Sequence, residues 1–231
     1  MTINHHSLWQ TNASENIVDT PLKSHEHCDL VVIGAGYSGL SAALHAAQQG
    51  MSVRVLEAKK MGHGSSGRNV GLVNAGLWTP PNDVEKTLGI RAGAILNKAL
   101  AKAPELVFSL IKKHQINCDG LRNGTLHCAS DRAGLKQLKA HLTQQIARNA
   151  PVELLTSLET RQRTGSTKFL GSLLNHRAGT IHPLNYALGL AQAATNAGAI
   201  IHTHCCPALT CQHNGRSWVV NTAYGALVQI S

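Results

Sequence analysis

The sequence predicts an α/β fold that contains a parallel β-α-β unit, and three observations support this fold class. An apolar run over residues 30–33 has the length and composition of a buried strand. A glycine-rich turn over residues 34–39 follows it and leads into a helix that we expect to begin at Tyr37. A second apolar run over residues 52–56 predicts the next strand, which ends at the acidic Glu57. Elements in this order connect two neighbouring parallel strands.

The glycine turn has the spacing G-x-G-x-x-G, which is typical of dinucleotide-binding proteins. Gly34 allows a sharp turn off the strand, and Gly36, which lacks a Cβ atom, lets backbone N–H groups approach a pyrophosphate. Gly39 lets the helix pack closely on the strand, and the helix N-terminus presents unpaired N–H groups to an anion. An ordinary glycine turn is the alternative, but it does not explain three glycines together with the acid. We expect the cofactor contacts of this turn to come from Gly34, Ala35, Gly36, Tyr37, Ser38 and Gly39.

Glu57 and the loop that follows it indicate which dinucleotide is bound. Glu57 lies 18 residues after Gly39, close to the spacing of the carboxylate that binds a ribose hydroxyl, and an acid there disfavours the 2′-phosphate of NADP. A plain NAD-dependent dehydrogenase would next alternate helix and strand. Residues 58–76 instead form a loop rich in glycine and serine, which can wrap a cofactor with backbone and hydroxyl donors. A flexible linker is the alternative interpretation of this loop.

This loop resembles the G-x-G-A-S-G-R-N-G-G segment of the FAD-dependent oxidoreductases of the D-amino-acid oxidase type, and more narrowly their gamma-glutamylputrescine oxidoreductase-like branch. Four further segments follow that branch in order, at residues 114–119, 124–127, 179–191 and 196–202. The resemblance implies FAD as the cofactor. It also implies a Rossmann-like FAD-binding domain joined to part of an α+β substrate domain.

The resemblance implies flavin contacts from the loop residues Ser66, Arg68, Asn69 and Gly71. Val70 departs from the motif, which has the first of two glycines at this position. The fit near the flavin ring depends on how the chain accommodates this larger side chain.

Two positions farther along the chain are also implied by the resemblance. Ala208 matches a residue that gives a backbone contact to the adenine half of the cofactor. His182 is a candidate for lining the substrate site, with a structural role at the start of a helix as the alternative. No residue is assigned as catalytic.

The expected domain organisation has four segments: a polar arm over residues 1–27, a first FAD-binding segment over 28–115, part of a substrate domain over 116–182, and an incomplete return to the FAD-binding domain over 183–231. Members of the family are considerably longer. We therefore expect this chain to be the N-terminal part of a flavoenzyme, truncated at the C-terminus and inactive alone.

Charge and composition narrow the classes of partner. Residues 86–177 carry 15 Lys or Arg and 5 Asp or Glu, but the basic residues recur at helical spacings that suit solvated faces. The chain has only eight aromatic residues, and none of them is grouped with the basic residues into a platform on which bases could stack. Nucleic-acid binding is therefore not expected. Residues 178–231 contain Arg216 as their single Lys, Arg, Asp or Glu, which predicts a stretch buried in a complete protein.

Cysteine, histidine and hydropathy patterns point to a reducing compartment and to no metal. The six cysteines form no C-x-x-C pair, and Cys205 and Cys206 are interpreted as two small packing residues on a strand. We expect no metal site from the histidine pairs, although Glu26 lies between His25 and His27. No signal peptide or membrane span is evident, so a cytoplasmic location is expected.

Other elements follow from periodicity and turn residues. Apolar spacing over residues 91–114 predicts a helix that Pro104 breaks or kinks. Pro183 is expected to begin a helix that Gly198 ends, and Ser130 to cap another. The expected inner face of the helix after Ser130 is Leu135, Leu138, Leu142 and Ile146, and the expected strands are 125–128, 199–203 and 218–222.

The functional hypothesis is an FAD-dependent oxidoreductase that takes a small amine or amino acid as its substrate. An amine C–N bond would become an imine as a hydride passes to the flavin. Two alternatives stay open: a non-catalytic dinucleotide-binding fragment and an NAD-dependent dehydrogenase.

Overall fold

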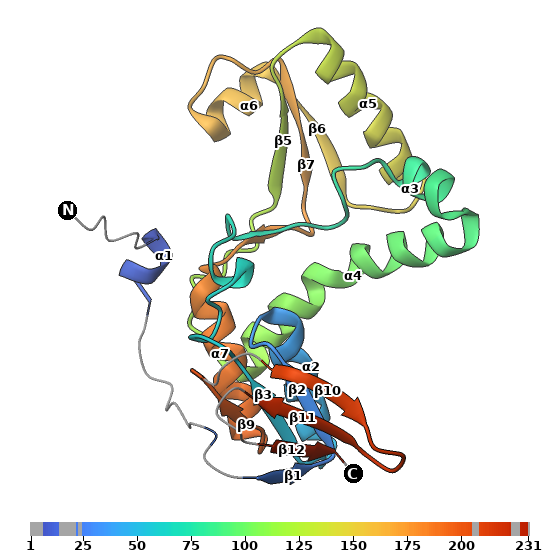
Figure 1. The fold of residues 1–231 in the computed structure, drawn as a ribbon. Helices are drawn as coiled ribbons and strands as arrows, with labels where there is room; N and C mark the ends of the chain where they lie inside the picture. Colours follow the sequence, from blue (N-terminus) through green and yellow to red (C-terminus); the bar gives the residue numbers. More distant parts are fainter. Residues whose placement is uncertain (1–6, 14–21, 23–24, 205–207, 223–226, 231) are drawn as a thin grey trace, which may run out of the picture. The chain divides into compact units, whose positions relative to one another are not determined.

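The computed structural model describes residues 7–13, 22, 25–204, 208–222 and 227–230, and these residues form two compact units (Figure 1). Unit 1 comprises Met1–Val70, His114–Cys118 and His182–Ser231 as far as they are described, and unit 2 comprises Gly71–Lys113 and Asp119–Ile181. Residues 71–113, which the sequence analysis assigned to the FAD-binding domain, therefore group with the second unit. How the complete protein divides into domains stays a prediction.

A three-stranded parallel sheet forms the centre of unit 1. Its strands are β2 (Leu30–Ile33), β3 (Val53–Leu56) and β9 (Ile200–His202), in the order β2-β3-β9. Val53 and Val55 of the middle strand are fully buried, as expected for a strand with a neighbour on each side. The three strands confirm the sequence predictions for 30–33, 52–56 and 199–203 to within a residue at each end.

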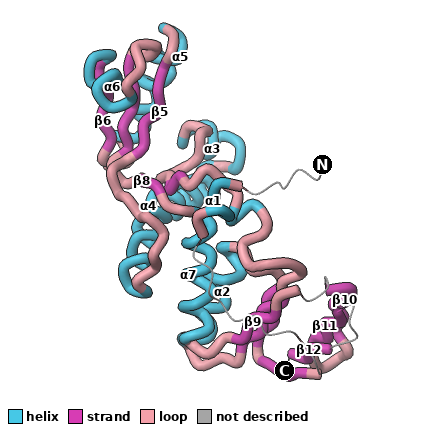
Figure 2. The backbone as a smooth tube through the Cα atoms, turned by 90° about the vertical axis from the view of Figure 1, so that its left-hand side faces the viewer, coloured by secondary structure: helices cyan, strands magenta, loops and turns pink. Residues whose placement is uncertain are grey.

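Two helices, α2 (Tyr37–Gln48) and α7 (Pro183–Asn196), pack against each other in unit 1 and run side by side in Figure 2. Leu40 and Leu44 of α2 and Leu190 of α7 are buried, and both helices contact strands of the parallel sheet. The predicted helix from Pro183 is confirmed, and Gly198, at φ +104°, follows its C-terminus.

A second sheet in unit 1 has the order β1-β12-β11-β10. It consists of β1 (Glu26–Cys28), β12 (Leu227–Ile230), β11 (Trp218–Thr222) and β10 (Ala208–His213). Cys28 of β1 and Val220 of β11 share a buried cluster with Leu56, the last residue of β3. Through this cluster the second sheet packs against the end of β3, the strand that precedes Glu57. The short helix α1 (Leu8–Thr11) precedes β1, while Cys205 and Cys206 lie outside the described residues.

Unit 2 is built on an antiparallel sheet with the order β5-β7-β6. Helices α5 and α6 are drawn beside this sheet in Figure 1, and Leu138 of α5 packs with Ala129 and Leu173 in its core. A two-stranded pair, β4 with β8, completes the strands of the unit. The bounds are β4 (Leu72–Val73), α3 (Pro81–Leu88), α4 (Ile90–His114), β5 (Thr125–Ala129), α5 (Arg132–Ile146), β6 (Val152–Thr156), α6 (Ser157–Thr164), β7 (Gly171–Asn175) and β8 (Gly179–Thr180).

Two predictions about helix α5 were wrong in detail, and one about α4 was wrong in part. The cap of α5 is Asp131 rather than Ser130, because the Asp131 carboxylate accepts the N–H of Gly134 at 2.7 Å. Ile146 is 56% exposed rather than on the inner face, because it lies in the last turn, beyond the end of the packed stripe. Helix α4 continues through Pro104, which is buried, so the predicted break is wrong, and a kink at this proline stays a prediction.

Candidate cofactor site

The chain turns sharply between β2 and α2. Gly34 has a φ of +98°, a conformation that residues with a side chain rarely adopt. At Gly39 a Cβ atom would lie 2.0 Å from the carbonyl oxygen of Gly34 and 3.1 Å from Val32, so only glycine allows the helix to sit this close to the strand. A Cβ atom on Gly36 would lie 2.9 Å from the hydroxyl of Ser66. Each glycine is required for a different physical reason.

The N-terminus of α2 presents backbone donors. Gly36 is its N-cap and has no side chain that could bond to the first turn. The N–H of Tyr37 donates to the hydroxyl oxygen of Ser66 at 3.1 Å. Among the described residues, the N–H groups of Gly36, Ser38 and Gly39 have no hydrogen-bond acceptor. An α-helix of twelve residues that starts in this way presents donors that suit an anion.

Glu57 is fixed against the same turn. Its Oε2 atom accepts the N–H of Ala35 at 2.8 Å, and its Oε1 atom accepts the N–H of Lys59 at 2.9 Å. The backbone N–H of Glu57 donates to the carbonyl of His202 on β9, which fixes the residue at the end of the sheet. A carboxylate has about four acceptor positions, so two donors leave capacity for the hydroxyls of a sugar.

The loop after Glu57 folds back on α2 through Ser66 and Asn69. The turn η1 (Ser65–Gly67) places the Ser66 hydroxyl at the first turn of α2. Asn69 donates from Nδ2 to the carbonyl of Ser66 at 2.8 Å and to the hydroxyl of Tyr37 at 3.1 Å. Ser66, Asn69 and the glycine turn therefore form one hydrogen-bonded group.

Arg68 adds positive charge at the surface of this loop. Its side chain is exposed, and its Nε–H donates to the carbonyl of His63 at 2.6 Å. Burial, together with the charges of Lys59 and Arg68, lowers the pKa of His63, so the imidazole is neutral near pH 7. The cations beside this loop are therefore Arg68, Lys59 and Lys60.

His182 is buried at the start of α7, where it acts as the N-cap. Its Nδ1 atom accepts the N–H of Asn185 at 3.1 Å, and its ring contacts the indole of Trp9 edge-on at 4.9 Å between centroids. In the described part of the chain, Nε2 has no hydrogen-bond partner. Trp9 in turn donates from Nε1 to the carbonyl of Asn69 at 2.9 Å, which links His182 to the loop. The sequence analysis missed Trp9, because only its contacts with distant residues reveal its place.

The last two expected contact residues lie in different units. Ala208 begins β10 in unit 1 and packs against the cluster that contains Leu56. Gly71 lies at the start of unit 2 with φ +76°, and its carbonyl accepts the N–H of Ile181 at 2.9 Å.

Comparison with known proteins agrees with this geometry. The family model described as "FAD dependent oxidoreductase" matches residues 29–230. The chain belongs to this FAD-dependent oxidoreductase family. It is 34% identical over 195 residues to gamma-glutamylputrescine oxidoreductase of Escherichia coli, an alignment that covers 84% of this chain and 45% of that protein. It is also 34% identical over 199 residues to the probable oxidoreductase OrdL of Haemophilus influenzae, covering 84% of this chain and 46% of that one.

Solved structures of an oxidase and a deaminase share the fold. Glycine oxidase from Geobacillus kaustophilus superposes with a TM-score of 0.73 at 20% identity, covering 89% of this chain and 54% of that chain. L-Amino acid deaminase from Proteus myxofaciens gives a TM-score of 0.73 at 20% identity, covering 95% of this chain and 47% of that one. This FAD-dependent oxidoreductase chain therefore spans about half the length of the relatives it matches.

The cofactor of the family is FAD, and the residues of unit 1 fit it. The unpaired N–H groups at the start of α2 suit a pyrophosphate, and the carboxylate of Glu57 beside them suits a ribose. In the described residues, no three His, Cys, Asp or Glu side chains gather as they would around a metal ion. No described helix is long and apolar enough to cross a membrane.

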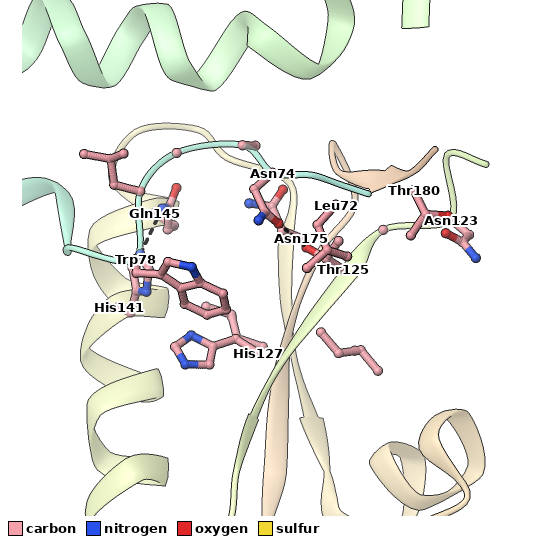
Figure 3. Close-up of a pocket in the computed structure, with 16 residues that line it drawn as sticks. Leu72, Asn74, Trp78, Asn123, Thr125, His127, His141, Gln145, Asn175 and Thr180 are labelled. Carbon is pink, nitrogen blue, oxygen red and sulfur yellow. Dashed lines mark hydrogen bonds between the residues drawn. The ribbon is translucent and has the colours of Figure 1, made fainter. Parts of the chain in front are cut away.

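Unit 2 contains a cavity that no pattern in the sequence predicted (Figure 3). It has a volume of about 330 Å³ and lies between the loop that carries Trp78, strand β5 and helix α5. His127 contacts Trp78 edge-on at 4.7 Å, and Nε2 of His141 lies 3.0 Å from Nε2 of Gln145. Burial lowers the pKa values of both histidines, and His127 adds to the effect at His141. Both imidazoles are therefore neutral at pH 7.

Proposed function

We propose that this chain binds FAD at the N-terminus of α2 and serves an enzyme that oxidises the C–N bond of a small amine or amino acid. One observation carries the proposal: the N–H groups of Gly36, Ser38 and Gly39, which have no acceptor among the described residues, lie beside the carboxylate of Glu57. This combination provides donors for a pyrophosphate and acceptors for a ribose, which are the two recognition elements of an adenine dinucleotide.

Each expected contact residue then has a role. The backbone of residues 34–39 would hold the pyrophosphate, and Glu57 would accept the ribose hydroxyls. Ser66 and Asn69 would position the loop, and Arg68 would supply positive charge to the flavin side. Gly71 and Ala208 would contribute backbone contacts to the flavin side and the adenine side, respectively.

Bound FAD would supply the redox chemistry, as the acceptor of the hydride that leaves the carbon next to the amine nitrogen when the C–N bond is oxidised to an imine. The protein residues bind and orient the two partners. His182 is a candidate for lining the substrate site, although its Nδ1 contact with Asn185 also suits a purely structural helix cap. The names of the relatives, which include an amine oxidoreductase and oxidases or deaminases of amino acids, support a small amine or amino-acid substrate.

Replacing Glu57 with alanine should weaken FAD binding by about 1–3 kcal/mol, the contribution of a hydrogen bond to a charged group. The carboxylate is the acceptor that the ribose hydroxyls would use, and it also fixes the N–H of Ala35. FAD is titrated into the parent and the Glu57 variant, and the change in flavin fluorescence gives the two FAD affinities. Asp83→Ala, an exposed acid in unit 2, is the control and should bind FAD like the parent. Equal affinities for the Glu57 variant and the parent would remove Glu57 from the site.

Replacing Arg68 with alanine should raise the Kd for FAD about tenfold and leave the Kd for ADP nearly unchanged, because Arg68 is expected to contact the part of FAD that ADP lacks. Parallel calorimetric titrations with FAD and ADP provide the comparison. Lys60→Ala removes an exposed charge from the same loop and should affect both ligands slightly and equally. An equal loss for FAD and ADP in the Arg68 variant would place this arginine on the adenine side.

A further inference from the structure

A second cavity in unit 2 has a strongly cationic lining. Its volume is about 450 Å³, within the usual range for sites of small organic molecules. Four cationic side chains, Lys98, Lys102, Arg148 and Arg177, line it together with one carboxylate, Glu85. Lys98 and Lys102 lie one helical turn apart on α4, so both are on the face that borders the cavity. The excess of positive charge favours an anion.

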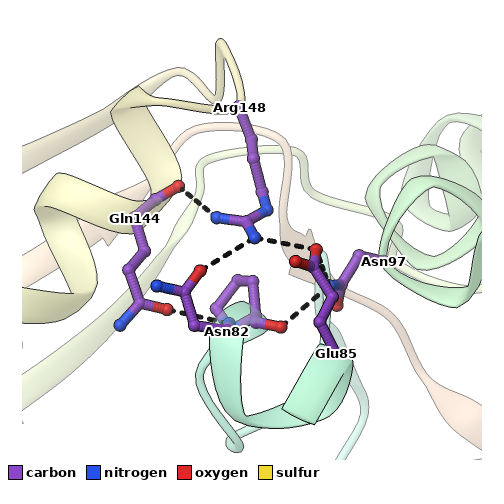
Figure 4. A network of polar contacts seen from close by, with 6 residues as sticks. Asn82, Glu85, Asn97, Gln144 and Arg148 are labelled. Carbon is purple, nitrogen blue, oxygen red and sulfur yellow. Dashed lines mark hydrogen bonds and ion pairs between the residues drawn. The ribbon is translucent and has the colours of Figure 1, made fainter. Parts of the chain in front are cut away.

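The one carboxylate in the lining is already engaged (Figure 4). Oε1 of Glu85 accepts from a terminal nitrogen of Arg148 at 2.8 Å and from Nδ2 of Asn97 at 3.1 Å. Arg148 also donates to Asn82 at 2.9 Å and to the carbonyl of Gln144 at 3.1 Å. In this network the charge of Arg148 is balanced by its ion pair with Glu85. The network contains no second carboxylate that could balance Arg177.

Arg177 is the half-buried cation of the cavity that lacks an acidic partner among the described residues. It is half-buried, and within the described residues no carboxylate lies within 4 Å of its guanidinium. Its described side-chain partners are neutral: Nε donates to Asn175 at 3.2 Å and a terminal nitrogen donates to Gln145 at 3.3 Å. Asn175 and Gln145 orient the guanidinium without cancelling its charge. A partly buried cation without an acidic partner is costly, and a bound anion would remove that cost.

We propose that this cavity is a binding site for a small dianion that carries a carboxylate or phosphate group. Arg177 would bind one anionic group through the donors that Asn175 and Gln145 leave free, since a guanidinium has five N–H groups and a planar fork that matches both anions. Lys98 and Lys102, which are exposed at the cavity and form no ion pair with a described residue, would bind the second charge.

Calorimetric titration of the full chain with inorganic phosphate and, separately, with succinate tests the site and distinguishes the two anion classes. Arg177→Gln should raise the Kd of the better ligand at least about tenfold, the effect of one charge-assisted hydrogen bond. Lys98→Gln, an exposed change that leaves the core intact, should raise it about threefold. Lys136→Gln removes an exposed lysine of α5 that does not line the cavity, and it should leave the Kd unchanged.

The start of α2 could also bind phosphate, so the titrations are repeated in the presence of saturating ADP, which is expected to occupy that site. Binding that is lost with ADP present and kept in Arg177→Gln would assign the anion to the cofactor site and overturn the proposal. Absence of binding of both anions to the parent chain, or equal affinity in the parent, Arg177→Gln and Lys98→Gln, would overturn it as well. Failure of FAD binding would leave this test intact, because the variants that decide it lie in unit 2.

Discussion

Replacing Gly39 with alanine should abolish FAD binding and lower the free energy of unfolding by about 3 kcal/mol, the cost of overpacking a tightly packed site. The added Cβ atom would lie 2.0 Å from the carbonyl oxygen of Gly34. That oxygen belongs to the backbone of the turn and cannot rotate away as the end of a flexible side chain could. The helix would have to move off β2, and the unpaired N–H groups at its start would move with it.

Gly64→Ala is the matched control for this substitution. Gly64 lies in the same unit with a φ of −73°, and no atom lies within 4 Å of where its Cβ would be. Its unfolding free energy should change by less than about 0.5 kcal/mol, and its FAD affinity should equal that of the parent. Denaturant unfolding and flavin fluorescence measure the two quantities. A Gly39→Ala protein that binds FAD like the parent would show that this turn does not hold the cofactor.

The 231-residue chain should give no measurable oxidation of amines, even at saturating FAD. A flavin amine oxidation site depends on a preorganised, water-excluded environment. In the described structure, β2 lies at an edge of its parallel sheet, and Ile33 at its end, next to the glycine turn, is 57% exposed. Parallel strands are normally covered on both faces, so we expect this side of the proposed cofactor site to be open to water. The relatives that this chain matches are about twice as long.

An assay of hydrogen peroxide formation with gamma-glutamylated and simple amines tests this prediction. Gamma-glutamylputrescine oxidoreductase of Escherichia coli, assayed under the same conditions, serves as the positive control. The flavin absorbance and oligomeric state of the purified chain are recorded alongside, because the exposed apolar surface should favour self-association. A soluble yellow monomer that oxidises any of these amines would contradict the prediction and make the chain a self-sufficient enzyme.

The local elements of unit 1 could be predicted because each carries its own signal. The strand over residues 30–33, the helix from Tyr37 and the helix from Pro183 follow from apolar periodicity, glycine spacing and proline placement, which depend on residues close in sequence. The antiparallel strands β6 and β7 carry weaker signals. Their pairing joins residues 152–156 to 171–175, and such long-range pairing depends on packing that no local pattern describes.

Some residues of the candidate cofactor site could also be proposed from local sequence, and others could not. Gly34, Gly39 and Glu57 could be assigned from spacing alone, because a turn that packs a helix on a strand has one sequence pattern. The Ser66 hydroxyl at the N–H of Tyr37, 29 residues away, could not, since it depends on how the loop folds back. Nor could Trp9, which bonds to Asn69 across 60 residues.

By itself, the sequence determined the α/β class, the dinucleotide-binding turn and the resemblance to the FAD-dependent oxidoreductases. Only the tertiary structure decided which side chains surround the turn, which histidines are half-buried and neutral, and that Arg177 lines a cavity with no acidic partner among the described residues. The physical reason is the sequence separation over which each kind of interaction acts. Turn geometry and helix periodicity act over a few residues, whereas burial and charge pairing arise only when segments from distant parts of the chain pack together.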